Sequence, residues 1–312
     1  MTASKILVVF GSTGNQGGSV VEHVLKDPVL SKEYKIRAVT RDTSKPAAQE
    51  LTKLGDVEVV QGDLTDAASI KSVLEGAHTV FVATATVYGE RLEEIEKLQG
   101  KNAADAAVAA GASYIIYSSQ PNVAKVSGGK YTRCGHFDAK NDVEQYIRGL
   151  PIRSAFFGPG TFMQNFANHT GPKPAGDGTY FLASIAVPTA EFPLINIQDT
   201  GKWVGAILAN PDAFEGKFVP AASEVLTWEE IAQAISKATG KTVVYKQIPE
   251  SVLEARMPPG SAPLLVDMFF YFQDFGYYGP ETRKVVAEGV ASARGKPATF
   301  AEFLEQTNYT LA

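Results

Sequence analysis

The sequence predicts an α/β fold in which a doubly wound parallel sheet precedes a smaller C-terminal lobe. Residues 5–10 are almost all apolar, as in a strand buried on both faces of a parallel sheet, and a glycine-rich turn and a helical pattern follow at once. Strand and helix patterns then alternate as far as the Gly-Pro-Gly at 158–160. We therefore predict a sheet domain at 1–157 and a lobe at 158–312 that is interleaved with it.

The first strand, turn and helix have the form of a Rossmann dinucleotide-binding unit. Its glycines are spaced G-x-x-G-x-x-G. Gly11 would permit the sharp turn, Gly14 the close approach of a pyrophosphate, and Gly17 the close packing of helix on strand. The helix N-terminus would offer free N–H groups to phosphates. A glycine-rich turn after a strand can also be a plain connection, so this turn alone does not decide the function.

The remaining elements of the predicted sheet domain follow in alternation. We expect strands at 34–40, 57–61, 79–83, 113–118 and 152–156, and helices at 47–54, 66–74, 92–110 and 136–147. Asp66 is the expected N-cap of its helix, and Gly76 and Gly111 the expected C-terminal stops. Connections of this length predict right-handed crossovers and a parallel sheet.

Beyond residue 160 the predicted elements are sparse. We expect a Pro/Gly-rich loop at 172–179, extended segments at 180–187 and 242–246, and helices at 200–208, 227–238, 264–272 and 300–306. Thr227 and Glu230 form a capping-box pattern at the start of the second helix. Because these pieces are few and scattered, we expect no independent core but a lobe packed over the carboxyl edge of the sheet.

Composition excludes several classes of function. The 312 residues are 45% hydrophobic, the net charge is −5, and no dense Lys/Arg run favours direct nucleic-acid binding. Cys134 is the only cysteine, and the histidines at 23, 78, 136 and 169 lack metal-site spacing. We expect neither a signal peptide nor a membrane span, which predicts a cytoplasmic protein.

The end of the second strand indicates which cofactor the turn would hold. A free ribose 2′-hydroxyl usually meets an acidic residue there, whereas a 2′-phosphate needs positive charge. Here Thr40 is followed by Arg41, with Lys45 four residues further on. A guanidinium can bind a phosphate in a forked geometry. The sequence therefore favours NADP over NAD, although Asp42 could take a ribose hydroxyl.

Polar residues also follow the third and fourth strands. Asp63 lies where a carboxylate could accept a hydrogen bond from the adenine amine, or it could simply form a turn beside Gly62. Residues 84–86, Thr-Ala-Thr, could face the ribose and nicotinamide or form an ordinary strand-end turn. Their shared position at the carboxyl ends of neighbouring strands favours cofactor binding for both.

The expected reaction centre departs from the short-chain dehydrogenase pattern, in which a Tyr acid is followed four residues later by a Lys. Lys140 fits that pattern, but His136 occupies the Tyr position. His136 is either a structural residue or a proton donor that titrates near neutrality. Ser118 could bond a substrate carbonyl or a cofactor amide, and Tyr131 lies in a nearby loop and could donate a proton instead.

These residues together resemble the NmrA-like family, atypical relatives of the short-chain dehydrogenases/reductases. The resembling segments are 8–17, 38–41, 59–63, 136–140, 162–165, 199–201, 226–231 and 239–244. The resemblance implies a Rossmann domain that binds NADP(H). Together with the strand-end positions, it assigns to the cofactor Gly11, Ser12, Thr13, Gly14, Asn15, Gln16, Gly17, Arg41, Lys45, Asp63, Leu64, Thr84, Ala85, Thr86, Ser118, Lys140, Phe162, Met163, Gln164 and Asn165.

The resemblance implies two alternative functions. Redox sensors of this family bind NADP(H), lack the Tyr and act through a protein partner, so our leading hypothesis is a cofactor-sensing regulator. Other members reduce quinones or small biosynthetic intermediates. The rival is therefore an NADPH-dependent reductase of a small carbonyl, imine or quinone, bound between Thr84, Tyr131, His136 and Asn165. The oligomeric state stays open.

Overall fold

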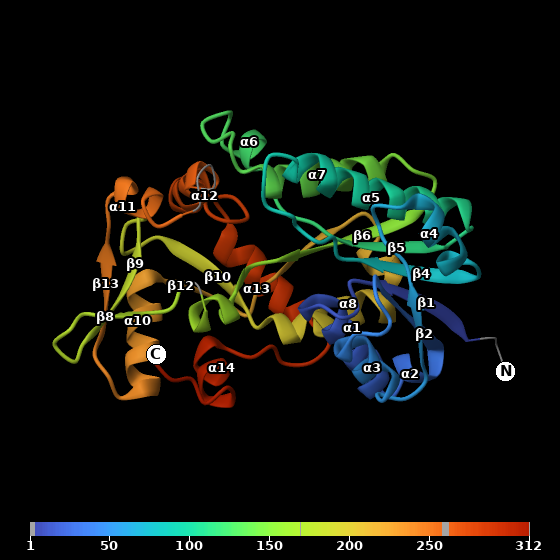
Figure 1. Cartoon of the computed structure of the whole chain (residues 1–312), viewed down its shortest axis with the longest axis horizontal. Coiled ribbons are helices and arrows are strands. Elements are labelled where there is room, and N and C mark those ends of the chain that lie inside the picture. Colours follow the sequence, from blue (N-terminus) through green and yellow to red (C-terminus); the bar gives the residue numbers. More distant parts are fainter. Residues whose placement is uncertain (1–3, 169, 258–261, 312) are drawn as a thin grey trace.

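The computed structural model describes residues 4–168, 170–257 and 262–311. Its largest sheet has seven parallel strands in the order β11-β6-β5-β4-β1-β2-β3 (Figure 1). Their bounds are β1 Lys5–Phe10, β2 Tyr34–Thr40, β3 Val57–Gln61, β4 Ala77–Val82, β5 Tyr114–Ser118, β6 Arg153–Pro159 and β11 Phe218–Ala221. The strand order runs outward from β1 and β4 in opposite directions, which confirms the predicted doubly wound sheet.

Helices cover both faces of this sheet (Figure 1). Their bounds are α1 Asn15–Lys26, α2 Leu30–Glu33, α3 Pro46–Thr52, α4 Ala67–Lys71, α5 Leu92–Ala109, α7 Gly135–Arg148, α8 Thr200–Ala209 and α9 Pro211–Phe214. The short helix α6 Val123–Val126 packs on α7 instead. Successive strand side chains point to opposite faces. Leu7 and Val9 of β1 accordingly pack in the cluster that contains α1 and α8 residues. Val8 and Phe10 pack in the cluster that contains α5 and α7 residues.

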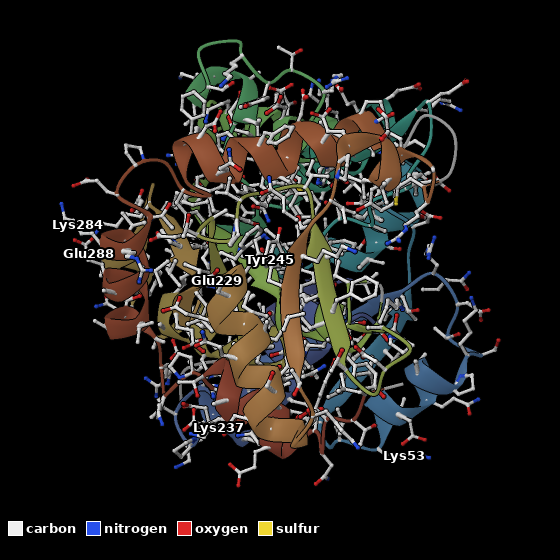
Figure 2. All side chains as sticks on the ribbon, turned by 90° about the vertical axis from the view of Figure 1, so that its left-hand side faces the viewer. Lys53, Glu229, Lys237, Tyr245, Lys284 and Glu288 are labelled. Carbon is white, nitrogen blue, oxygen red and sulfur yellow. The ribbon has the colours of Figure 1, made fainter. Side chains whose placement is uncertain are left out.

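The second lobe contains two three-stranded sheets, β12-β10-β7 and β13-β9-β8. Their bounds are β7 Thr161–Phe162, β8 Lys173–Pro174, β9 Tyr180–Ser184, β10 Glu191–Ile195, β12 Glu224–Thr227 and β13 Val243–Gln247. The later helices are α10 Trp228–Thr239, α11 Glu250–Glu254, α12 Ala262–Phe275, α13 Thr282–Ser292 and α14 Phe300–Gln306. Figure 2 looks onto this lobe, where β13, which carries Tyr245, runs beside α10, which carries Glu229 and Lys237.

The second lobe has a large aromatic core that it shares with the sheet domain. Phe192, Trp228, Tyr271 and Phe300 are buried in one large cluster, together with aromatic residues from several other segments. Trp228 stacks on Tyr245 with ring centroids 5.4 Å apart. Aromatic side chains bury a large area each, so short segments far apart in the sequence can share one core. The cluster also includes residues from before 158, among them Val123 and Phe137 of the sheet domain's helices.

Most predicted elements occur within one to four residues of the expected ends. Asp66 caps α4, and Thr227 and Glu230 form the predicted capping box. The sequence analysis missed the strands β7, β8, β10, β11 and β12, the helix α13, and the short helices α2, α6, α9 and α11. Strand β11 completes the main sheet beside β6, and α8 packs against α1, so parts of 158–312 belong to the sheet domain. No helix among the described residues is long and apolar enough to cross a bilayer.

Candidate functional site

The glycine turn after β1 leads directly into α1. Gly11 has a φ of +71°, a backbone conformation that glycine adopts without strain. The Gly14 amide donates to the Gly11 carbonyl at 2.9 Å, and Gly14 is the N-cap of α1. A Cβ built on Gly17 would lie 2.3 Å from that same carbonyl oxygen. The glycine turn therefore packs directly on the first turn of α1, and a side chain at Gly17 would prevent this contact.

Two side-chain hydrogen bonds link the turn and the start of α1 to other strands of the sheet. The buried Ser12 hydroxyl donates to the Val39 carbonyl of β2 at 2.8 Å, so its role within the turn is structural. The Ser118 hydroxyl at the end of β5 donates to the Gln16 side chain, also at 2.8 Å. Thr13 and Asn15 are exposed. The structure thus brings the carboxyl ends of β1, β2 and β5 together around the start of α1.

The N-terminus of α1 suits an anion. The first N–H groups of a helix lack partners within it and carry partial positive charge. The first turn of α1, which is described in full, contains no acidic residue. An anion placed here would meet backbone donors with no opposing side-chain charge.

The end of β2 adds positive charge near this turn. Arg41 and Lys45 are exposed, and neither forms an ion pair with any part of the chain that the structure describes. Asp42 accepts from the hydroxyl and the amide of Ser44 at 2.6 and 2.9 Å. These bonds lower the pKa of the Asp42 carboxyl and occupy one of its oxygens in a local turn. Within the described ranges, Arg41 and Lys45 are thus both available to a ligand, and Asp42 keeps one carboxylate oxygen outside its turn.

Asp63 also forms a turn. Its Oδ1 accepts from the amide and the hydroxyl of Thr65, both at 2.8 Å. The Leu64 carbonyl accepts from the Asn102 side chain at 2.8 Å. The turn-forming alternative for Asp63 therefore has direct support, and its second oxygen is the part that could reach an adenine amine.

Lys140 lies in a polar network at the end of β4. Its Nζ donates to the Thr84 hydroxyl at 2.8 Å and to Oε1 of Glu96 at 2.6 Å. The Thr86 hydroxyl donates to the other oxygen of Glu96 at 3.0 Å. The Ala85 amide donates to the Gln99 side chain at 2.9 Å. The structure thus joins Lys140 directly to Thr84 and, through Glu96, to Thr86.

The sequence analysis missed Glu96 and Gln99, both buried on α5. A signal for them was present in the spacing. Leu92, Glu96, Gln99 and Ala103 fall on one helical face, which packs inward, whereas Glu94 is exposed. A charged or amide side chain on an otherwise apolar helical face indicates a buried polar partner.

His136 is the second residue of α7 and is partly buried. Its ring lies edge-on to Phe137 at 4.8 Å and 6.3 Å from the ring of Tyr88. Burial, reinforced by the positive charge of Lys140, lowers the pKa of His136 to about 4. This lowered pKa favours the structural alternative for His136 over a proton donor that titrates near neutrality, because burial disfavours the charged imidazole.

The structure does not bring Tyr131 into the Lys140 network. Its hydroxyl donates to Asp274 of α12 at 2.6 Å, and its ring packs edge-on against Phe275. Asp274 also pairs with Lys130. Burial, followed by the bond to Asp274, raises the pKa of the Tyr131 phenol. This geometry describes a residue that attaches its loop to α12, which is the physical reason against a proton-donor role.

Residues 162–165 connect the sheet domain to the second lobe. Phe162 packs against the α1 side of the main sheet, whereas Met163 is buried in the core of the lobe. The Gln164 side chain donates to Asn196 at 2.7 Å and accepts from the Ile197 amide at 3.2 Å. Asn165 is partly buried and accepts from Thr170 through its backbone carbonyl. Their cofactor roles stay predictions.

The described ranges contain a further cleft, which lies away from the carboxyl ends of β1, β2 and β4. This cleft of about 530 Å³ opens between β11, α7 and α13, and none of the sequence-predicted site residues lines it. No group of three His, Cys, Asp or Glu residues that could hold a metal ion occurs in the part of the chain that the structure describes. Residue 169, one of the four histidines, lies outside that part.

Comparison with known proteins identifies the family. The NmrA-like family model matches residues 3–304. An NmrA-like family domain-containing protein of Dictyostelium discoideum is 31% identical over 315 residues, 99% of each chain. An NmrA-like family domain-containing oxidoreductase of Aspergillus flavus is 29% identical over 300 residues, 90% of this chain and 88% of its own.

A solved structure of the negative transcriptional regulator NmrA, in complex with NADP, is 25% identical with a TM-score of 0.81 and covers 96% of this chain and 94% of NmrA. NmrA in complex with NAD gives a TM-score of 0.80 with the same identity and coverage. The agreement extends over both the sheet domain and the second lobe. This protein therefore belongs to the NmrA-like family.

Proposed function

We propose that this protein binds NADP(H) at the carboxyl ends of β1, β2, β4 and β5. The observation that carries the proposal is the Gly11–Gly17 turn, which places the acid-free N-terminus of α1 close to β2. Arg41 and Lys45 follow β2 and form no ion pair within the described part of the chain. The turn would hold the pyrophosphate, Arg41 and Lys45 the 2′-phosphate, and Lys140 the nicotinamide ribose.

The residues present fit such a cofactor. Gly14 is exposed at the mouth of α1, so backbone can approach a pyrophosphate without an intervening side chain. Asp42, which could take a ribose hydroxyl, has one carboxylate oxygen engaged by the amide and the hydroxyl of Ser44. NmrA has been solved with both NADP and NAD. The choice between the two cofactors therefore rests on Arg41 and Lys45 in this chain.

As biological role we propose a cofactor-sensing regulator that acts through a protein partner. The support is that neither proton donor expected from the sequence is poised beside Lys140, because His136 is neutral at physiological pH and Tyr131 is bonded to Asp274. The name of NmrA as a negative transcriptional regulator points the same way. Occupancy by NADP(H) would change the surface around residues 84–91 that is offered to the partner.

A second candidate, an NADPH-dependent reductase, has one specific observation in its favour. Tyr88 stands next to His136 and is 65% exposed. Burial of its hydroxyl end and nearby negative charge raise the pKa of this phenol, so it keeps its proton at neutral pH. The bound nicotinamide would supply the hydride, and Tyr88 or water the proton. Turnover in an NADPH-oxidation screen with quinones, imines and enones, lost in Lys140→Ala, would favour this candidate.

Substitution of Arg41 tests the cofactor assignment. Arg41→Ala should weaken NADPH binding by about 2 kcal/mol, because the 2′-phosphate loses a charged partner, while NADH binding changes little. Isothermal titration calorimetry with both cofactors measures the two losses. Arg256→Ala, at an exposed arginine of the other lobe, is the matched control. Equal losses for NADPH and NADH would reject the role of Arg41.

A further inference from the structure

The carboxylate of Glu96 is the centre of the network around Lys140. Glu96 is fully buried on α5, and only 14% of the Lys140 side chain is exposed. Oε1 accepts from Lys140 and from the Thr84 hydroxyl, and Oε2 accepts from the Thr86 hydroxyl at 3.0 Å. Each oxygen of this buried carboxylate therefore has a partner, as a buried charge requires.

Gln99, one helical turn after Glu96, binds the backbone of the same segment. Its amide nitrogen donates to the Ala85 carbonyl at 3.1 Å, and its oxygen accepts from the Ala85 amide at 2.9 Å. The two α5 side chains thus bind residues 84, 85 and 86 in succession. That segment follows β4, which lies beside β1 at the point where the strand order reverses. This is the crevice in which doubly wound sheets bind their ligands.

The Lys140 ammonium keeps one donor for a ligand. A lysine Nζ carries three N–H groups, and Thr84 and Glu96 accept two of them. Without Glu96, Lys140 would be a largely buried cation with no carboxylate partner, which is unfavourable. Glu96 therefore allows a charged Lys140 to lie here and determines the direction of its remaining N–H.

We propose that Glu96 is a positioning residue for the nicotinamide half of the cofactor. It holds Lys140 and, through Thr84 and Thr86, the segment beside which that half would lie. The inference rests on the proposed NADP(H) site. It assigns Glu96 no contact with the cofactor and predicts that its loss affects only ligands that reach Lys140.

A comparison of two ligands tests this inference. NADPH reaches the nicotinamide end, whereas 2′,5′-ADP carries the adenine, the 2′-phosphate and one 5′-phosphate but no nicotinamide ribose. Glu96→Leu, which removes every hydrogen bond, should weaken NADPH at least about tenfold and leave 2′,5′-ADP within about twofold. Glu96→Gln, which keeps the shape and can still accept from Lys140, should recover part of the NADPH affinity.

The other outcomes are distinguishable. Glu94→Leu, at an exposed glutamate on the same helix, should change neither affinity. Equal weakening of both ligands by Glu96→Leu and Glu96→Gln would show a merely structural role, and unchanged NADPH affinity in both would show none; either result overturns the inference. A wild-type protein that binds neither ligand would instead refute the proposed NADP(H) site, and this inference with it.

Discussion

Gly17 lies so close to Gly11 that a Cβ on Gly17 would sit 2.3 Å from the Gly11 carbonyl oxygen and 2.5 Å from its carbonyl carbon. Both atoms belong to backbone, which cannot swing away as a flexible side chain can. The third glycine of the turn is therefore required by packing between α1 and the end of β1, independently of any ligand. The same contact fixes where the N-terminus of α1 points.

Gly17 and its neighbour Gly18 should respond differently to substitution by alanine. Gly17→Ala should destabilise the fold by about 1–3 kcal/mol, because the turn must move to admit the methyl group. Gly18→Ala places its Cβ at 3.4 Å from the Ser12 carbonyl and should be neutral or slightly stabilising, since alanine favours helix. Urea denaturation measures both changes. Equal stability of the two variants would contradict this packing.

The sequence predicts the first six strands of the main sheet well because each is an apolar run that ends at a glycine or a polar turn. Strand β11 escapes such analysis, since its four residues include Pro220 and it is recognisable only once it lies beside β6. Helix α13 contains Gly289, where a Cβ would lie 2.1 Å from the Pro220 carbonyl oxygen. That glycine lowers helix propensity but permits the close tertiary contact.

The residues of the candidate site likewise divide into those that the sequence predicts and those that only the fold reveals. The turn, Arg41 and Lys140 are predictable because chain position relative to a strand or to a short motif fixes their role. The pKa of His136 depends mainly on how deeply the folded chain buries its ring, and Tyr131 bonds Asp274, which is 143 residues further along the chain, so spacing reveals neither. Glu96 is an intermediate case, with helical spacing that indicates burial but no local sign of its partner Lys140.

The lowered pKa of His136 predicts a pH dependence of stability. Between pH 6.5 and about 4 the unfolded chain binds a proton here that the folded protein does not, so the free energy of unfolding falls as the pH falls. His136→Gln removes this contribution. From pH 7 to pH 5, wild type should therefore lose about 1–2 kcal/mol more stability than the variant, by urea denaturation at each pH. His23 is present in both proteins, so its contribution to the pH dependence cancels from the comparison. A larger loss in the variant would contradict the buried, neutral imidazole.

Tyr131→Phe tests whether that hydroxyl takes part in chemistry. The hydroxyl bonds a partly exposed carboxylate, so its loss should cost about 1 kcal/mol of stability or less. If a substrate is found, Tyr131→Phe should keep turnover within about twofold at saturating substrate, whereas Tyr88→Phe should lose about tenfold or more. Steady-state rates measured where chemistry is limiting decide the matter. A large loss confined to Tyr131→Phe would restore it as the proton donor.

The most direct test of the central claim is a calorimetric titration of the unmodified protein with NADPH and, in parallel, with NADH. The glycine turn, the acid-free start of α1 and the exposed cations Arg41 and Lys45 predict saturable binding at one site per chain. They also predict that NADPH binds at least about tenfold more tightly than NADH, because only NADPH carries the 2′-phosphate. Failure to bind either cofactor, or tighter binding of NADH, would contradict the account.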